Sequence, residues 1–368
     1  MTMRILYVLT SLGIGGAERQ TLAVASRMAQ RGHTVSLLVL RPELTEEWPT
    51  SLPVVHLNMR KAPWRVLASL LAGRRFLRQF QPDLIHSHCF HANLVARLLR
   101  RAIPSARLLC TIHNVYEGGW HRMLLYRLTD RRLTRTTAVS GAAMRRFVAC
   151  GAVAAAKCMV VGNGIDVDAF APCPSRRTAM RTEMCTRAEF IWLAAGRITP
   201  AKDISNLLRA FTLIGSSHPD ARLWVAGAPT EEEFEKVNTL ARELGVTGSV
   251  CWLGLRRDLP ALMDAADGFV LSSAWEGMPL VVGEAMAFEK PVVATDAGGV
   301  RELVGDAALV VPIRDPEALA TAMGKVMEMT AEERSALGRA ARTRMLDQFS
   351  MEAKACEWEA LYGAVLSE

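Results

Sequence analysis

Short apolar runs alternate with segments of helical periodicity along most of the chain. The runs lie at residues 4–10, 34–40, 54–57, 83–88, 107–112 and 137–140 in the first half, and at residues 190–195, 222–227, 250–254, 268–271, 292–295 and 308–311 in the second. Runs of this length are typical of strands buried on both faces. Because helical segments separate them, the pattern predicts an α/β fold with two parallel sheets, each in a Rossmann-like unit.

The segment at residues 65–81 shows helical spacing with two kinds of side chain. Its apolar residues gather near one face of the expected helix: Val66, Leu67, Leu70, Leu71, Leu77 and Phe80. Arg74, Arg75 and Arg78 fall on another face. We therefore expect a crossover helix that packs its apolar face on the sheet.

The size of the chain allows two domains. It has 368 residues, of which 50% are hydrophobic, enough for two cores of ordinary size. Pro172, Pro174 and Ser175 mark a change in composition between the two sets of runs. We expect an N-terminal domain at residues 1–172 and a C-terminal domain at residues 173–350.

The stretch at residues 269–287 carries two carboxylates where an apolar strand gives way to a helix. Gly277 and Pro279 interrupt the run, which places Glu276 on the loop and Glu284 in the second helical turn. Both can then face one ligand at the carboxyl end of a parallel strand, beside helix N–H groups that bind anions. A nucleotide sugar offers hydroxyls to the carboxylates and phosphates to the amides. The alternative is a solvated loop glutamate with an ordinary helical glutamate.

A longer motif surrounds these glutamates. Glu276-Gly-Met-Pro, a spacing of seven residues between the two glutamates, and a string from Lys290 to Val304 closely resemble family 4 retaining glycosyltransferases. The resemblance implies a GT-B fold, with two Rossmann-like domains facing a central cleft, and a C-terminal helix near residues 351–368 that packs back on the first domain. It implies that Glu284 binds the donor ribose and that Glu276 lies beside the transferred sugar. The backbone that follows Glu276, at Gly277, Met278, Pro279 and Leu280, would also contact the donor.

The same resemblance extends to loops earlier in the chain. An arginine and a lysine at the spacing of Arg197 and Lys202 contact the diphosphate in the family, whereas the loop alone fits surface charge equally well. Gly15 and Gly16 stand in a Gly-Gly-Ala-Glu string that lies near the donor phosphates and the acceptor. His113 occupies a Thr-x-His position near the donor sugar, with a core or capping histidine as the alternative. Glu289 departs from the family, where many members have glycine.

The chemistry that the resemblance implies is sugar transfer from a nucleoside diphosphate with retained anomeric configuration. Negative charge grows on the departing diphosphate, so Arg197, Lys202 and the loop amides are expected to stabilise the transition state. No metal and no cofactor is expected. His86, His88 and His91 lack a further ligand at regular spacing, and the eight cysteines form no Cys-x-x-Cys pair. We expect reduced and mostly buried thiols.

Charge is distributed unevenly along the chain. Residues 1–188 contain 27 Lys and Arg against 10 Asp and Glu, whereas residues 189–368 contain 17 against 27. We expect the first domain to dock on an anionic membrane and to take a glycan or lipid-linked acceptor, as in polysaccharide or lipopolysaccharide biosynthesis. The candidate contacts are Arg74, Arg75, Arg78, Trp120, Arg122, Tyr126, Arg127, Arg131, Arg132 and Arg135. A solvated arginine-rich surface is the alternative, and no nucleic-acid motif accompanies the charge.

Location and function leave further alternatives. The apolar runs are too short to span a bilayer and the first residues lack a signal-peptide pattern, so we expect a cytoplasmic protein, peripheral on the inner face of the cell membrane. A GT-B nucleotide-sugar epimerase, a catalytically silent membrane-bound sugar-binding protein and an NADP oxidoreductase are the rival functions. The last is prompted by the glycine loop and Arg41, but the loop lacks a third glycine.

Overall fold

The computed structural model describes residues 2–13, 15–42, 48–186, 190–228 and 230–368. Its contacts divide the chain into two compact units. Unit 1 comprises Met1–Gly164 and Met351–Glu368, and unit 2 comprises Ile165–Ser350. The division precedes the expected boundary at residue 172. Ile165 already belongs to unit 2, because its N–H donates to the carbonyl of Phe349 at 2.7 Å.

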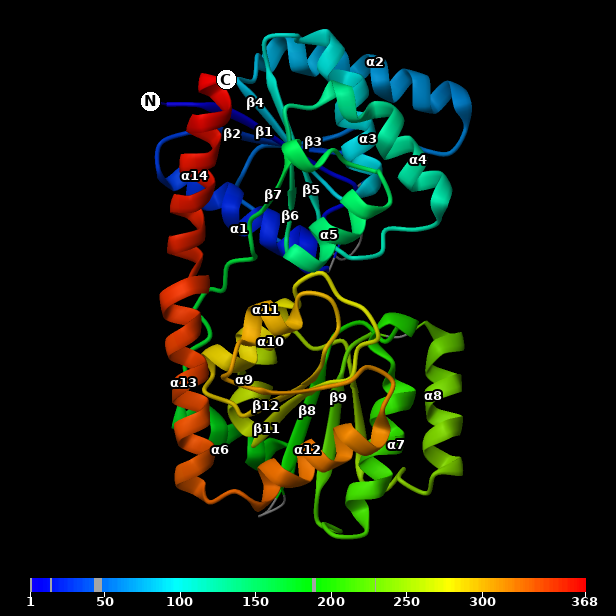
Figure 1. Cartoon of the computed structure of the whole chain (residues 1–368), viewed down its shortest axis with the longest axis vertical. Coiled ribbons are helices and arrows are strands. Elements are labelled where there is room, and N and C mark those ends of the chain that lie inside the picture. The colour runs from blue at the N-terminus through cyan, green and yellow to red at the C-terminus, as the bar shows by residue number, and fades with distance from the viewer. Residues whose placement is uncertain (1, 14, 43–47, 187–189, 229) are drawn as a thin grey trace. The chain divides into compact units, whose positions relative to one another are not determined.

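Unit 1 is built on a seven-stranded parallel sheet in the order β3-β2-β1-β4-β5-β6-β7 (Figure 1). The strands are β1 Arg4–Leu9, β2 Thr34–Val39, β3 Val54–His56, β4 Leu84–His88, β5 Arg107–Ile112, β6 Arg135–Ala138 and β7 Cys158–Val160. The helices are α1 Gly16–Gln30, α2 Pro63–Phe80, α3 Phe90–Leu99, α4 Trp120–Thr129, α5 Gly141–Ala149 and α14 Met351–Ser367. The pattern missed β7, an edge strand whose Met159 and Val160 are exposed.

The last helix, α14, is part of the core of unit 1. It packs beside α1 over the face of the sheet that carries Tyr7 and Leu37 (Figure 1). The hydroxyls of Tyr7 and Tyr362 lie 3.0 Å apart, and the Tyr362 hydroxyl is 2.7 Å from His86 Nδ1. A buried polar chain therefore fixes α14 against β1 and β4.

Helix α2 differs from the expectation in which face it buries. Ser69, Gly73 and Leu77 face the core, and the Ser69 hydroxyl donates to the carbonyl of Leu57 at 2.9 Å. Leu67 and Leu71, expected to pack inward, are more than half exposed. At 100° per residue they lie opposite the contact line through Ser69, Gly73 and Leu77. The apolar stripe predicted from the sequence is therefore divided between the core and the surface.

Unit 2 contains a six-stranded parallel sheet in the order β10-β9-β8-β11-β12-β13 (Figure 1). The strands are β8 Ile191–Ala195, β9 Arg222–Ala226, β10 Val250–Gly254, β11 Gly268–Leu271, β12 Val292–Thr295 and β13 Leu309–Val311. The helices are α6 Pro174–Glu183, α7 Ile204–Gly215, α8 Glu231–Glu243, α9 Leu259–Ala265, α10 Leu280–Ala287, α11 Val300–Val304, α12 Pro316–Glu328 and α13 Ala331–Phe349. Trp192, Leu207, Phe211 and Leu319 lie in a core cluster of this unit.

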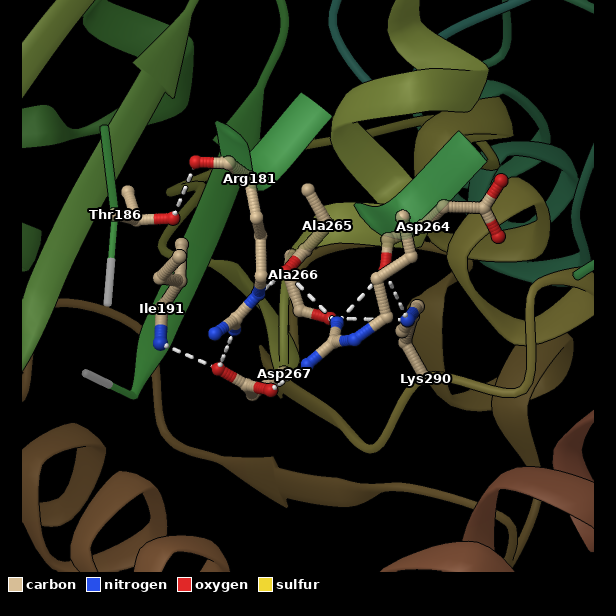
Figure 2. Close-up of polar contacts among 9 residues, drawn as sticks. Arg181, Thr186, Ile191, Asp264, Ala265, Ala266, Asp267 and Lys290 are labelled. Carbon is tan, nitrogen blue, oxygen red and sulfur yellow. Dashed lines mark hydrogen bonds and ion pairs between the residues drawn. The ribbon is translucent and has the colours of Figure 1, made fainter. Parts of the chain in front are cut away.

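A polar network ties α6 to the end of α9 (Figure 2). The last carbonyls of α9 accept bonds from cations: Ala265 from Arg181, and Asp264 and Ala266 from Lys290. The Asp267 carboxylate pairs with Arg177 and Arg181 and accepts the N–H of Ile191 at the start of β8. Cations are favoured at a helix C-terminus, and here a carboxylate balances their charge. This network anchors the first helix of unit 2.

Glu289 occupies a backbone position that suits glycine, the residue that many members of the resembling family have there. It follows α10 with φ 57°, a left-handed conformation that favours glycine. Its N–H donates to Met286 O and that of Lys290 to Ala285 O, both at 3.0 Å, which closes the helix as a C-terminal glycine would.

Replacing Glu289 by glycine is expected to raise the free energy of unfolding of unit 2 by about 1 kcal/mol, because it removes the strain of a side chain in the left-handed region. Urea denaturation measures the change. Glu289→Ala is the matched control. It keeps the strained backbone conformation and removes only the long ion pair between the Glu289 carboxylate and Arg342, at 3.9 Å. A glycine variant no more stable than the alanine variant would contradict this account.

Candidate functional site

The predicted donor residues of unit 2 lie at the point where the strand order of its sheet reverses. Strands β8 and β11 are neighbours, and the chain leaves them in opposite directions across the sheet. Ligands of open parallel sheets bind outside the carboxyl ends of such strands. Arg197 and Lys202 follow β8, and Glu276 follows β11. The fold therefore places these residues on two adjacent loops.

Lys202 and Glu276 are in direct contact. The Lys202 ammonium donates to Glu276 Oε1 at 2.6 Å, and the Ser273 hydroxyl donates to the same oxygen at 2.7 Å. Both charged side chains are largely buried, with 19% and 13% of their surfaces exposed. Arg197 is exposed, and no hydrogen bond or ion pair of its side chain is found within the described ranges. The loops thus present one paired cation and one solvent-facing cation.

Two glycines allow the loop after β8 to lie close to its neighbours. Gly196 has φ +136°, and a Cβ at this position would lie 2.9 Å from Lys202 Cε. A Cβ on Gly227 would lie 1.9 Å from the carbonyl oxygen of Gly196. Any larger residue at Gly227 would push the loop away from β9, so the position of Lys202 depends on both glycines.

The segment from Gly277 to Glu284 leads from the loop into α10. Gly277, Met278, Pro279, Leu280 and Glu284 are buried. The helix begins at Leu280, with Pro279 as its N-cap residue and not its first helical residue, and Glu284 occupies the second turn as expected. The N–H of Gly299 donates to Gly277 O at 2.9 Å, which joins this loop to the one after β12. The predicted amide and carboxylate groups are therefore contiguous.

The glycine candidates of unit 1 lie at the corresponding reversal in its own sheet, between β1 and β4, and His113 lies one strand further along. Strand β4 separates β1 from β5. Gly15 is the N-cap residue of α1, Gly16 begins that helix, and His113 follows β5. A Cβ on Gly15 would lie 2.3 Å from the Glu18 carboxylate, so the loop is compact. Ile14, inside the predicted glycine loop, lies outside the described residues.

His113 belongs to a cluster of histidines that the sequence did not reveal as a unit. Its Nε2 lies 2.9 Å from His88 Nδ1, and the rings of His86 and His88 are 4.1 Å apart. Burial lowers the pKa of His113 to about 4 and that of His88 well below its ordinary value. All three imidazoles are therefore neutral at pH 7. The period-two spacing of His86 and His88 was the only local signal of this arrangement.

Glu117 is a second residue that sequence reasoning missed. It accepts bonds from the N–H of His113 at 3.2 Å and the hydroxyl of Tyr126 at 2.7 Å. Burial raises the pKa of Glu117 to about 7, although these bonds and Arg122 oppose the rise. Glu117 lies four positions after His113, and its hydrogen bond to the His113 N–H means that a carboxyl group able to titrate near neutrality supports the predicted histidine.

Metal-binding residues do not gather in the described part of the chain. There, no group of three or more His, Cys, Asp and Glu side chains has a geometry that could hold a metal ion. All eight cysteines are free thiols, as expected, but only Cys110 is fully buried, and Cys185 and Cys356 are exposed. The expectation of mostly buried thiols was therefore wrong.

The basic surface of unit 1 is smaller than expected. Tyr126 is fully buried and bonded to Asn93 and Glu117, because it points from α4 toward the sheet. The guanidinium of Arg122 donates to the Glu117 carbonyl, and Arg135 pairs with Glu368. Trp120 remains 78% exposed. Within the ranges that the structure describes, no helix combines the length and apolar character required to cross a membrane.

Comparisons with known proteins agree on one family. Residues 185–344 match the family described as glycosyl transferases group 1, and residues 14–169 match glycosyltransferase family 4. D-inositol 3-phosphate glycosyltransferase of Corynebacterium urealyticum is 31% identical over 307 residues, which cover 75% of this chain and 70% of that protein. A galactosyltransferase of Escherichia coli, named for UDP-Gal and GlcNAc-diphosphoundecaprenol, is 24% identical and covers 66% of this chain and 63% of its own.

The similarity extends to solved structures. Anabaena HepE, crystallised with UDP and glucose, aligns with a TM-score of 0.87 at 21% identity, covering 98% of this chain and 100% of its own. A sucrose-phosphate synthase of Thermosynechococcus elongatus aligns with a TM-score of 0.86 at 20% identity, covering 99% of each chain. These likenesses show the GT-B fold. With the sequence matches, they establish that the chain belongs to the group 1 glycosyltransferases of family 4.

Proposed function

We propose that the chain transfers a sugar from a nucleoside diphosphate to a membrane-associated glycan or lipid acceptor, with retention of anomeric configuration. The observation that carries the proposal is the meeting of Lys202 and Glu276 beside α10, at the carboxyl ends of β8 and β11. Cations there suit a diphosphate, and carboxylates suit sugar and ribose hydroxyls. HepE with UDP and glucose, a neighbour of the same fold, supports this class of donor.

The proposed chemistry assigns separate tasks to the two loops. As the glycosidic bond to the diphosphate breaks, the glycosyl carbon gains positive charge and the leaving oxygen gains negative charge. Lys202, Arg197 and the amides after Gly277 would stabilise the leaving group, and Glu276 would face the sugar. Glu284 would hold the ribose. Gly15, Gly16 and His113 are proposed to contact the donor sugar and acceptor from unit 1.

A panel of nucleotide sugars tests the donor class. Binding measured by thermal shift, together with nucleotide release that depends on an added acceptor extract, is the result expected of a transferase. A donor present at a hundred times its dissociation constant would add about 2.7 kcal/mol to stability. Release of nucleotide without any acceptor would instead indicate an epimerase or a hydrolase. Binding without turnover would indicate a sugar-binding protein.

Glu284→Gln is expected to weaken donor binding by about 1.5–3 kcal/mol, because an amide accepts fewer hydroxyl bonds than a carboxylate. Calorimetric titration with the donor found in the panel measures this loss. Glu302→Gln, on α11 of the same unit, is the matched control and should leave affinity within twofold. An unchanged affinity of the Glu284 variant would rule out its ribose role.

Membrane association is proposed for unit 1 from charge and exposed apolar side chains. This unit has 24 Lys and Arg against 11 Asp and Glu, whereas unit 2 has 20 against 26. Trp64 and Leu67 on α2, and Trp120 and Leu128 on α4, are 59–78% exposed. Arginines accompany them at Arg65, Arg74, Arg75, Arg78, Arg127 and Arg131. Apolar insertion and attraction to anionic lipid act together in such surfaces.

Salt-sensitive binding to anionic vesicles is the expected result in co-sedimentation, with little binding to neutral vesicles. Arg127→Glu with Arg131→Glu should reduce it, since each basic group near anionic lipid contributes about 1 kcal/mol. A pair on the acidic unit, Arg242→Glu with Lys236→Glu, controls for total charge. Equal binding to both lipids, or none, would contradict the membrane proposal and leave the donor proposal standing.

A further inference from the structure

If the proposed donor binds, the Lys202 ammonium faces two anionic groups, the Glu276 carboxylate and the diphosphate of the donor. Its ammonium already donates to Glu276 Oε1 at 2.6 Å. A diphosphate oxygen within hydrogen-bond distance of the same nitrogen would lie about 5–6 Å or less from that carboxylate. Like charges at such a distance, in a site that is mostly shielded from solvent, repel each other appreciably. Glu276 and a diphosphate therefore compete for one cation.

The pair is held in place by its surroundings. Ser273 is fully buried, donates to Glu276 Oε1, and accepts the Thr295 hydroxyl through its carbonyl at 2.6 Å. On the other side, the backbone carbonyl of Lys202 accepts the Ser272 hydroxyl at 2.8 Å, and the N–H of Ala274 donates to Ala201 O at 2.8 Å. One short segment after β11 thus positions both charges, so the contact is a preorganised feature of the site.

We propose that Glu276 acts as an internal competitor of the nucleoside diphosphate product, a role that rests on the proposed function. In the donor, the hydroxyls of the sugar give the carboxylate new hydrogen-bond partners, which offsets the loss of its lysine. Once the sugar has been transferred, those hydroxyls leave, and the ion pair between Glu276 and Lys202 forms again. The affinity of the site for the nucleoside diphosphate product is therefore lower than its affinity for the donor. The pair therefore discriminates donor from product and promotes product release.

The competition predicts an unusual gain of binding on removing a site residue. Glu276→Gln keeps the size of the side chain and its bond to Ser273 but releases the lysine. We expect it to bind UDP, GDP or ADP, whichever the wild type prefers, about tenfold more tightly, which is about 1.4 kcal/mol. Binding of the matching nucleoside, which lacks phosphate, should not change. Product inhibition of any remaining transfer should deepen correspondingly.

A double-mutant cycle separates competition for Lys202 from general repulsion. Calorimetry would compare the wild type, Glu276→Gln, Lys202→Met and the double variant, with thermal unfolding to confirm that each is folded. Competition predicts that the tenfold gain shrinks below twofold when Lys202 is absent. Asp296→Asn is the matched control, because it removes a carboxylate of the same unit that pairs with Arg301 and not with Lys202.

Each outcome of the cycle either supports or contradicts the competitor role of Glu276. A gain in Glu276→Gln that depends on Lys202 and is absent from Asp296→Asn supports the competitor role. No gain, a gain that persists without Lys202, or an equal gain in Asp296→Asn overturns it while leaving the donor class intact. If no nucleoside diphosphate binds the wild type or any variant, the proposed function fails and this role fails with it.

Discussion

Replacing Lys202 by methionine is expected to lower kcat/KM for sugar transfer about 10²–10³-fold, because the ammonium stabilises charge that grows on the departing diphosphate. Binding of the free nucleoside should stay within about twofold of the wild type, since that ligand lacks the phosphates. Arg197→Ala should cost less, because its exposed guanidinium is screened by solvent. Steady-state kinetics with the donor identified by the panel measures both losses.

Lys236→Met is the matched control for Lys202→Met. Lys236 lies on α8 of the same unit, where it pairs with Glu232 on the exposed surface. Its replacement should leave kcat/KM unchanged. An equal loss in both lysine variants, or a loss in Lys202→Met confined to nucleoside affinity, would refute the leaving-group role. The same assignment predicts transfer in the presence of a chelator, because protein cations supply the positive charge.

Lowering the pH from 7 to 4.5 is expected to destabilise unit 1 by several kcal/mol. The pKa values of His86, His88 and His113 are lowered by burial, so the folded unit binds fewer protons than the unfolded chain below pH 6.5. Their stabilisation is complete above that pH and is lost as the pH falls toward the folded pKa values. For His113, a pKa of about 4 corresponds to roughly 2–3 kcal/mol at pH 4.5.

The effect of Glu117 on the pH dependence of stability has the opposite sign to that of the three histidines. Its raised pKa, about 7, means that the folded unit holds a proton that the unfolded chain releases above pH 4.5. It therefore contributes stability at low pH that disappears as the pH rises toward 7. One carboxyl group offsets only part of the effect of three imidazoles, so the net result is loss of stability on acidification.

Hydrogen exchange of the amides of β4 and β5 between pH 4.5 and 7, corrected for intrinsic rates, reports the stability of unit 1 separately from unit 2. Glu117→Gln should make the acid destabilisation steeper, because it removes the opposing group. His121→Asn, on the exposed start of α4, is the control and should leave the slope unchanged. A stability of unit 1 that is flat or rises on acidification would contradict the assignment of neutral buried histidines.

Much of the fold was predictable because its signals are local. The structure places β10, β11 and β12 at the same residues as the apolar runs that predicted them. A strand buried on both faces in a parallel sheet needs a continuous apolar run, and glycine or proline commonly ends it. The loop that carries Glu276 and the helix that carries Glu284 were predictable for the same reason, because Gly277 and Pro279 end the apolar run. Family membership rested on the long ordered motif around these glutamates.

The faces of the helices were less predictable, because a helix can present apolar residues to more than one environment. Leu67 and Leu71 fit the apolar stripe of α2 but lie on the surface, whereas Tyr126, grouped by sequence with a basic surface, is fully buried. Periodicity identifies a stripe but not the neighbour that covers it. That neighbour is set by segments distant in sequence, such as β5 and α3 for Tyr126.

By itself, the sequence determined most of the strands, the presence of two units, the family and the residue types of the candidate site. Tertiary structure decided how those residues are paired. Lys202 and Glu276 are 74 positions apart, and His88 and His113 are 25 apart, yet each pair shares a hydrogen bond. Strand order brings their loops together, and strand order depends on the packing of the whole sheet. Apolar periodicity is read within a few residues, whereas such side-chain pairing exists only once the sheet has formed.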